Sequence, residues 1–295
     1  MISQEYQTFL VLSQTLSYTK TAQQLFISQP AVTQQIQRLE ASLALKLVVY
    51  KRPKLTLTLA GRQLAAFLTR TQAQAVKVLN NLQNDNQKRE ISFGITRSLG
   101  EVIGKKLISI MLNKANFTAL KCISGNTASI LAQIDNGTID FGIVEGNFDK
   151  HDFSYHIIRK EPFIPIVSCT HPLAQKESVT WNDLLSYPLI IREDGSGSRE
   201  ILTFLAQKEN ISLSDFSQLL TISEPTLLRL LVKDGLGISF LYKILVENDL
   251  TKGALKQLPL QRGIVEHELY FVYSKESFFA PDYQQWFQAL EALNN

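Results

Sequence analysis

The sequence predicts an α/β protein with an N-terminal winged helix-turn-helix, a long linker helix and a C-terminal α/β domain of two lobes. Three observations predict it: helical apolar spacing up to residue 43, a heptad pattern from 64 to 82, and alternating β and α patterns after 90. A length of 295 residues fits about two domains. The expected boundaries are 1–60, a linker helix and hinge at 61–90, and 91–295, with lobe I at 91–163 and 265–295 and lobe II at 164–264.

The composition indicates a globular chain. Hydrophobic residues make up 45% of the sequence and the mean hydropathy is −0.01, which excludes collagen-like and largely disordered proteins. No apolar run reaches the roughly 18 residues of a membrane span, and the start MISQEYQTFL lacks the pattern of a secretory signal. We expect a soluble cytoplasmic protein without a membrane partner.

Cysteine and histidine usage argues against a metal or redox site. We expect Cys122 and Cys169 to be small buried residues at strand ends, because free cysteine is among the most buried residue types. The histidines show no metal-ligand spacing; they are His151, His156, His171 and His267. Neither a metal nor a cofactor is expected.

Charge divides the chain into a basic head and a mildly acidic body. Residues 1–90 contain 11 Lys or Arg and 4 Asp or Glu, whereas residues 91–295 contain 19 and 23. A net charge of +7 on residues 1–90 indicates that this part alone binds an anionic macromolecule. A solvated charged helix face explains the charge equally well, so the residue pattern must decide.

The first 43 residues predict three helices. The first covers roughly residues 4–15, and the second starts near Thr19. The third starts at Ser28 as N-cap, with Pro30 in its first turn, where a missing N–H is tolerated. Its apolar stripe is Val32, Ile36, Leu39 and Leu43. Two helices joined by a turn of about four residues form a helix-turn-helix.

The face opposite that stripe carries hydrogen-bonding side chains and almost no acid. Glutamine suits the N6 and N7 atoms of adenine, and arginine suits the O6 and N7 atoms of guanine. On an unrelated helix such a face would only promote solubility. The candidate DNA-contacting residues are Ser28, Gln29, Pro30, Thr33, Gln34, Gln37 and Arg38.

A hairpin with a cationic tip follows the third helix. Residues 45–49 and 55–57 predict its strands, and the candidate wing residues are Lys51, Arg52 and Lys54. Such a wing can lie along phosphates or reach a minor groove, where cations are favoured. A basic surface turn is the alternative.

The segment after the hairpin predicts a long helix, capped by Thr58. Its heptad seam consists of Leu64, Leu68, Thr71, Ala75, Val78 and Leu82. The small residues allow close approach, so we expect a helix pair between two subunits, in a homodimer or homotetramer. The polar stretch 84–90 is expected to be a linker.

Residues 17–62 resemble the LysR-type transcriptional regulators. The resemblance rests on the run SYTKTAQQLFISQPAVTQQIQRLEASL, the wing, and LTLTLAGR before the long helix. It implies that Gln29, Pro30 and Thr33 face DNA, and that Lys51 and Arg52, with Lys54, serve the wing. One departure is Gln34, where family members often carry arginine.

The remaining residues predict strands that alternate with helices, which implies parallel sheets covered by helices on both faces. Two breaks, near Pro162 and Gly263, fit two lobes, with the last strand and helix returning to the first. This resembles the effector domain of the same family, which is similar in fold to periplasmic solute-binding proteins.

Polar residues that follow strands mark a candidate ligand site. Ligands of open α/β sheets lie beyond the carboxyl ends of strands, where helix N-termini present free N–H groups. The candidates are Ser98, Asn126, Thr127, Ser196, Gly197, Ser198 and Arg199. We expect an anionic effector, such as a carboxylate, sulfate-like or phosphorylated metabolite; helix capping without a ligand is the alternative.

No pattern indicates an enzyme, because phosphate loops, a nucleophile elbow and paired carboxylates are missing from the sequence. His171 is a candidate base without a partner nearby in the sequence. A solute-binding or sensor module without sequence-specific DNA binding is the alternative function, but it leaves the basic head unexplained. The expected partners are double-stranded DNA, a small-molecule effector, a second copy of the chain and RNA polymerase.

Overall fold

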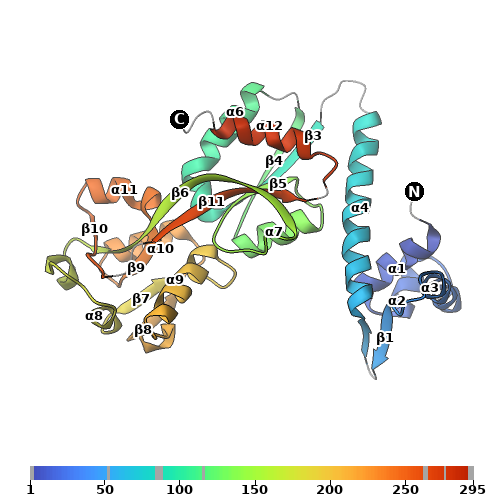
Figure 1. The fold of residues 1–295 in the computed structure, drawn as a ribbon, viewed down its shortest axis with the longest axis horizontal. Helices are drawn as coiled ribbons and strands as arrows, with labels where there is room; N and C mark the ends of the chain where they lie inside the picture. The colour runs from blue at the N-terminus through green and yellow to red at the C-terminus, as the bar shows by residue number, and fades with distance from the viewer. Residues whose placement is uncertain are drawn as a thin grey trace. The chain divides into compact units, whose positions relative to one another are not determined.

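The computed structural model describes residues 3–51, 54–83, 89–114, 117–261, 265–275 and 277–291, and its chain divides into two compact units. The first unit comprises the head and the long helix, and the second comprises the α/β domain (Figure 1). Each unit is described by itself below. Arg52, Gly263 and most of the predicted linker, 84–88, lie outside the described residues.

The first unit has the predicted order of elements. They are α1 (Gln4–Thr15), α2 (Tyr18–Leu25), α3 (Gln29–Leu43), β1 (Val48–Lys51), β2 (Lys54–Leu57) and α4 (Leu59–Gln83). The predicted cap of the third helix is confirmed, since the Ser28 hydroxyl accepts a hydrogen bond from the Ala31 N–H at 3.3 Å. The first hairpin strand begins later than predicted, because Leu45 to Leu47 form the turn that leaves α3.

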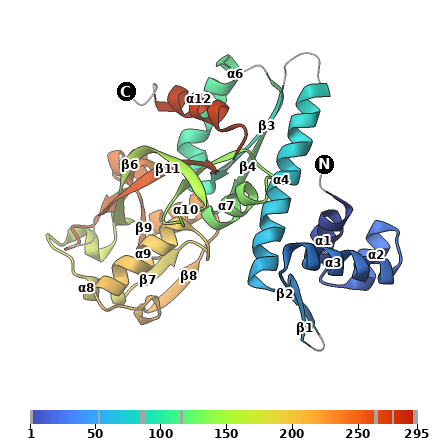
Figure 2. The same cartoon turned by 45° about the vertical axis from the view of Figure 1, so that its right-hand side comes forward.

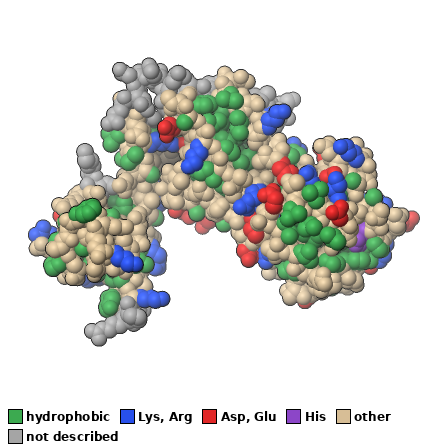
Figure 3. Space-filling view, turned by 180° about the vertical axis from the view of Figure 1, so that it is seen from behind, with side chains coloured by type: hydrophobic (Ala, Val, Ile, Leu, Met, Phe, Trp, Pro, Cys, Tyr) green, Lys and Arg blue, Asp and Glu red, His purple; other side chains and the backbone are tan. Residues whose placement is uncertain are grey.

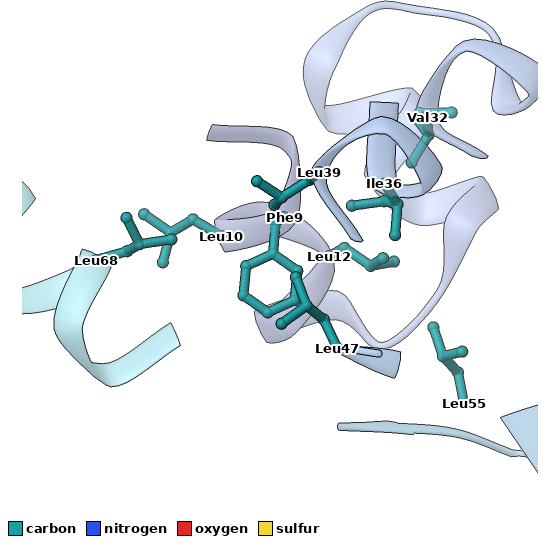
Figure 4. Packing of buried hydrophobic residues seen from close by; sticks show 10 residues of the cluster. Phe9, Leu10, Leu12, Val32, Ile36, Leu39, Leu47, Leu55 and Leu68 are labelled. Atoms are coloured by element: carbon teal, nitrogen blue, oxygen red, sulfur yellow. The ribbon is translucent and has the colours of Figure 1, made fainter. Parts of the chain in front are cut away.

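The helical spacing of apolar residues builds the core of the head. Phe9 and Leu12 of α1 pack against Val32, Ile36 and Leu39 of α3, and all five are at most 1% exposed (Figure 4). Leu47, Leu55 and Leu68 close this core from the hairpin and from α4. Burial of each such side chain stabilises the fold by about 1.5–3 kcal/mol.

Part of the predicted heptad seam belongs to this core. Leu68 is 4% exposed and Leu64 packs partly buried beside it. Leu68 is therefore not available to a second subunit, which corrects the seam at this position. Farther along α4, Val76, Leu79 and Leu82 are exposed.

A buried carboxylate ties α3 to the hairpin. Glu40 is 7% exposed and accepts hydrogen bonds from the Leu47 N–H at 2.8 Å, the Val48 N–H at 3.3 Å and the Lys46 Nζ at 2.6 Å. Burial opposes ionisation of Glu40, but these hydrogen bonds prevail and hold its pKa below the ordinary value. The acid therefore orients the wing relative to α3.

The α/β unit contains a seven-stranded sheet among its described residues, in the order β10, β6, β11, β5, β3, β4, with β9 paired to β6. Its strands are β3 (Arg89–Thr96), β4 (Phe117–Gly125), β5 (Phe141–Glu145), β6 (Phe153–Ser168), β9 (Ser239–Tyr242), β10 (Leu255–Gln257) and β11 (Val265–Ser274). A small parallel sheet pairs β7 (Pro188–Ile191) with β8 (Gln218–Thr221).

Helices cover these sheets. They are α5 (Arg97–Leu99), a π-helical segment (Gly100–Gly104), α6 (Lys105–Lys114), α7 (Thr127–Asp135), α8 (Trp181–Leu185), α9 (Gly197–Lys208), α10 (Pro225–Lys233), α11 (Lys243–Thr251) and α12 (Ala280–Glu291), with 3-10 turns at Pro172–Gln175 and Leu213–Asp215. Inside the larger sheet, the Phe141 ring stacks on Phe93 and Phe271, with centroids 5.4 and 4.7 Å away.

Two long strands join the two lobes (Figures 1 and 2). β11 pairs antiparallel with residues 153–163 of β6 along its whole described length, β5 pairs with the other side of β11, and β9 and β10 pair with β6 toward its C-terminal end. Lobe I is thus built on β3 to β5, and lobe II on β7 to β10. The predicted break between the lobes near Pro162 falls within β6, which continues from one lobe to the other.

The expectation of parallel sheets is confirmed only in part. β3 is parallel to β4 and β5, and β7 is parallel to β8, but the pairs made by β6 and β11 are antiparallel. The reason is topological: a strand that leaves lobe I and a strand that returns to it run in opposite directions. Apolar alternation by itself does not reveal strand direction.

The expected burial of both cysteines is also wrong. Cys122 and Cys169 are exposed. Cys122 lies on β4, at the edge of the sheet, where one side of the strand faces solvent. Cys169 directly follows the end of β6.

Replacing Glu40 by alanine is expected to destabilise the head by about 2 kcal/mol, because the buried N–H groups of Leu47 and Val48 lose their acceptor. Amide hydrogen exchange of the head in the full chain should then accelerate by about 30-fold. Lys46→Ala, which removes only an exposed partner, is the matched control and should change exchange by less than about fivefold. The difference in exchange rate between the Glu40→Ala variant and the unchanged chain should shrink as the pH falls through the lowered pKa of Glu40, since the ionised carboxylate makes these bonds. Equal exchange rates in both variants would contradict the assigned role.

Gly61→Ala is expected to destabilise the first unit although alanine favours a helix interior by about 1 kcal/mol. An added Cβ would lie 2.0 Å from the carbonyl oxygen of Leu47, so the start of α4 or the hairpin must shift. Gly100→Ala is the control, because its Cβ would make an ordinary 3.7 Å contact. Thermal unfolding of the full chain measures the stability of both variants. Amide exchange of head peptides then locates the effect of Gly61→Ala, and exchange of peptides from the α/β unit does so for Gly100→Ala. A stabilised Gly61 variant would refute the close approach.

Candidate nucleic-acid interface and ligand cleft

The outer face of α3 is open and polar. Gln29, Pro30, Gln34, Gln37 and Arg38 are all exposed. The acid of this helix, Glu40, is buried and engaged by the hairpin, so the exposed face carries no carboxylate. A helix with this surface fits the major groove, where amide and guanidinium groups read base edges.

The start of α3 is shaped by the turn that precedes it. Phe26 ends α2 in the left-handed region with φ 54°, and its side chain is 95% exposed. Ser28 is exposed while its hydroxyl caps the helix, and the Thr33 hydroxyl, half-buried, donates to the Gln29 carbonyl at 3.1 Å. Gln35 instead turns inward to Thr8 of α1. The structure therefore sorts the glutamines of α3 into one internal and several external side chains.

The wing is a short antiparallel hairpin in which Lys51 pairs with Lys54. Leu55 points into the head core and Lys54 is exposed. The side chain of Lys51 and all of Arg52 lie outside the described residues, so their predicted role stays a prediction.

Surface charge differs between the two units. Figure 3 shows Lys and Arg on the visible face of the head without Asp or Glu among them, whereas the two signs are mixed on the α/β unit. This distribution fits a polyanion that meets the head.

The residues predicted for a ligand site meet where the lobes face each other. Ser98 follows β3, Asn126 and Thr127 follow β4, and the segment 196–199 begins α9 of lobe II. The hydroxyl-bearing members are buried rather than lining an open surface: Ser98, Thr127, Ser196 and Ser198 are at most 4% exposed. Their burial makes hydrogen-bond partners obligatory.

The two lobes supply many of those partners to each other. Arg192 Nη1 of lobe II donates to the Ser98 hydroxyl of lobe I at 2.8 Å, and Arg97 of lobe I pairs with Glu193 of lobe II at 2.9 Å. Asn126 Nδ2 donates to the Asp194 carbonyl oxygen at 3.2 Å. Polar contacts between residues of the chain itself therefore hold the two lobes together.

Two glycines allow this close approach. A Cβ on Gly146, which follows β5 with φ 90°, would lie 2.4 Å from the Gly197 Cα. A Cβ on Gly197 would lie 2.2 Å from the carbonyl oxygen of Glu145. Any side chain at either position would hold the lobes apart. Gly197 therefore allows the two lobes to pack closely, and it also leaves the N–H groups at the start of α9 uncovered by a side chain.

The predicted anion-binding turn is internally satisfied in this arrangement. The hydroxyls of Ser196 and Ser198 lie 3.0 Å apart in a mutual hydrogen bond. Arg199 pairs with Asp194 at 3.0 Å and donates to the Arg192 carbonyl oxygen at 3.0 Å. An anion at this turn must therefore compete with contacts that already exist.

Sequence reasoning missed three central residues of the cleft. Glu145 ends β5 and is 1% exposed; the Thr96 hydroxyl donates to its carboxylate. Arg192 follows β7, is 3% exposed, and contacts Glu193 through Nε at 2.9 Å and Nη2 at 3.2 Å. Burial raises the pKa of Glu145, against the Thr96 bond and the charge of Arg192, which lower it. The signal was available, because Thr96, Glu145 and Arg192 all stand at strand ends, as Ser98 does.

His171 is buried and engaged by neighbouring residues. It is 6% exposed, its Nδ1 accepts from the Leu173 N–H at 3.2 Å, and its ring packs on Tyr187. Burial lowers its pKa. The described residues contain no group of three His, Cys, Asp or Glu that could hold a metal, and no helix among them is long and apolar enough to cross a membrane.

Comparisons with known proteins cover nearly the whole chain. The family model described as "LysR substrate binding domain" matches residues 84–294, and "Bacterial regulatory helix-turn-helix protein, lysR family" matches residues 3–62. The chain is 25% identical over 276 residues to the HTH-type transcriptional activator CmpR of Synechocystis sp., covering 92% of this chain and 88% of that protein.

Solved structures agree on the fold. ArgP from Mycobacterium tuberculosis matches with a TM-score of 0.70 at 14% identity, over 99% of this chain and 98% of that chain. The regulatory domain of CcmR from Synechocystis PCC6803, solved in complex with 2-PG, matches with a TM-score of 0.60 at 19% identity, over 69% of this chain and 96% of that chain. With both of its parts matched by family models in their expected order, the chain belongs to the LysR family of transcriptional regulators.

Proposed function

We propose that this regulator reads double-stranded DNA with the exposed face of α3 and contacts phosphates with its wing. The observation that carries the proposal is the polar, acid-free face of α3, held outward while its apolar stripe is buried. Gln29, Pro30 and Thr33 lie where α3 begins, with Gln34, Gln37 and Arg38 farther along. Lys54, with Lys51 and Arg52, supplies the cationic wing.

We further propose that the chain acts as a homodimer or homotetramer paired through α4. The exposed side chains of Val76, Leu79 and Leu82 support this, because apolar groups on one helix favour a partner helix. A two-fold pair of heads addresses half-sites about 34–36 Å apart or multiples of that spacing. RNA polymerase is the expected partner that couples DNA binding by this protein to a change in transcription.

The cleft of the α/β unit is proposed to bind a small anionic effector. Support comes from the strand ends and helix N-termini that meet there, and from the 2-PG complex of the CcmR regulatory domain, which has this fold. An effector shifts DNA binding only if its affinity differs between two arrangements of the oligomer, by about 1–3 kcal/mol in typical cases. Such a ligand can break the hydrogen bond between Arg192 and Ser98, which joins the two lobes.

Gln29→Ala is expected to reduce the difference in binding free energy between the preferred duplex and a duplex with one base pair changed by about 1–3 kcal/mol, because a base contact is lost. The preferred duplex is obtained by selection from random fragments with the purified chain. Gln14→Ala, an exposed glutamine on α1, is the matched control and should retain discrimination. If the unchanged chain selects no sequence at all, the alternative of a solute-binding module without sequence-specific DNA binding holds.

Lys54→Gln is expected to weaken binding to all duplexes about equally and to lower the slope of log K against log salt by about one. Lys208→Gln, on α9 of the α/β unit, is the control with the same charge change. Titrations of labelled duplex over a range of salt concentrations measure both slopes. An unchanged slope for the Lys54 variant would remove it from the DNA contact.

A further inference from the structure

The turn that precedes α3 carries an aromatic side chain that the fold does not use. Phe26 is 95% exposed, although phenylalanine is ordinarily among the most buried residue types. The next residue, Ile27, packs against the apolar core of the head, whereas Phe26 takes no part in that core. The stability of the head therefore gives no reason for a phenylalanine at this position.

The backbone makes the choice of residue more unusual. Phe26 ends α2 in the left-handed region, with φ 54° and ψ 39°, where glycine and asparagine fit best. The Ile27 N–H donates to the Ala22 carbonyl oxygen at 3.0 Å, so a backbone bond fixes the turn. Leu16 ends α1 in the same conformation, so the fold accounts for the backbone but not for the ring. An unfavourable backbone conformation at a residue whose side chain the fold does not need is typical of a functional site.

The surroundings of Phe26 suit a polyanion. The sequence contains no Asp or Glu between Glu5 and Glu40, and Phe26 lies within this stretch. Exposed polar residues flank the ring along the chain, with Gln24 before it and Ser28 after it. A duplex can approach such a surface without repulsion between like charges. Phe26 therefore extends the acid-free surface that includes the outer face of α3.

The ring lies close to the start of α3. Phe26 precedes Gln29, the first residue of that helix, by three positions, and three residues span at most about 11 Å. The N-terminal residues of a recognition helix are those that contact base edges. In the major groove, phenylalanine makes apolar contact with the methyl group of thymine. Packing on a base would also remove from water the apolar surface that the free chain leaves exposed.

We propose that Phe26 packs on the methyl group of a thymine beside the bases read by α3, and so contributes to sequence preference. This inference rests on the proposed function, in which α3 reads the duplex. It adds a residue outside α3 to the reading surface. Because a backbone hydrogen bond fixes the turn, the ring meets the same position in each half-site.

The test combines changes in the duplex with changes at Phe26. In the duplex selected by the unchanged chain, each thymine is replaced in turn by deoxyuridine, which lacks only the methyl group. At one position or more in each half-site this replacement should weaken binding by about fourfold, as expected for one buried methyl group. With Phe26→Gly, the replacement at one of these positions should change the affinity by less than about twofold. Phe26→Tyr keeps the ring and should preserve the fourfold effect.

Folding controls accompany these measurements. Glycine fits the left-handed conformation, so Phe26→Gly should unfold at the Tm of the unchanged chain or above it, and its loss of binding is then no loss of structure. Phe26→Asn also tolerates this conformation and should behave like Phe26→Gly. Leu16→Gly changes the corresponding residue at the end of α1 and should keep every methyl effect.

Three results would overturn the proposal. The first is a set of methyl effects that persists unchanged in Phe26→Gly. The second is an unchanged chain for which no thymine methyl matters. The third is a Phe26→Gly variant that binds DNA normally but differs in oligomeric state, since the ring would then serve a protein contact.

Selection from random fragments separates this inference from the proposed function. If the unchanged chain selects a sequence and Gln29→Ala loses discrimination, while the methyl effects do not depend on Phe26, then α3 remains the reader and Phe26 is removed from the contact. If the unchanged chain selects no sequence, both the proposed function and the contact of Phe26 are refuted.

Discussion

Buried polar groups must find partners, and this constraint connects the elements of both units of the chain. In the head, the Glu40 carboxylate cannot stay buried without donors, so the turn after α3 brings two backbone N–H groups to it. In the α/β unit, the buried guanidinium of Arg192 finds Glu193 and Ser98. Apolar packing supplies most of the stability, but these contacts set the geometry.

The head shows how one helix serves two purposes. Its 3.6-residue period places Val32, Ile36 and Leu39 in the core and leaves the opposite face free. Because Glu40 also faces inward, the outer face keeps a uniform polarity that suits the negative field of a duplex. The same carboxylate links α3 to the wing, so the two elements that we propose to contact DNA are held in one fixed geometry.

The cleft follows from the topology of the larger sheet. Parallel strands end at one edge, and two antiparallel strands carry the chain to the second lobe and back, which brings the polar ends of lobe I against the start of α9. Glycines at positions 146 and 197 let the backbones meet. A ligand in this cleft has to replace contacts such as those of Ser98 and Asn126, and that exchange is how binding can alter the arrangement of the lobes.

The sequence by itself determined the helix-turn-helix, the cap at Ser28, the hairpin and the polar residues at strand ends, because these depend on local periodicity and capping chemistry. It also indicated the family through the run from residue 17 to residue 62. Only the tertiary structure decided the direction of β6 and β11, the exposure of Cys122 and the packing of Leu68 in the head. The same holds for the pairing of Arg192 with Ser98 and of Thr96 with Glu145, since these depend on which distant segments meet, and local spacing carries no information about that.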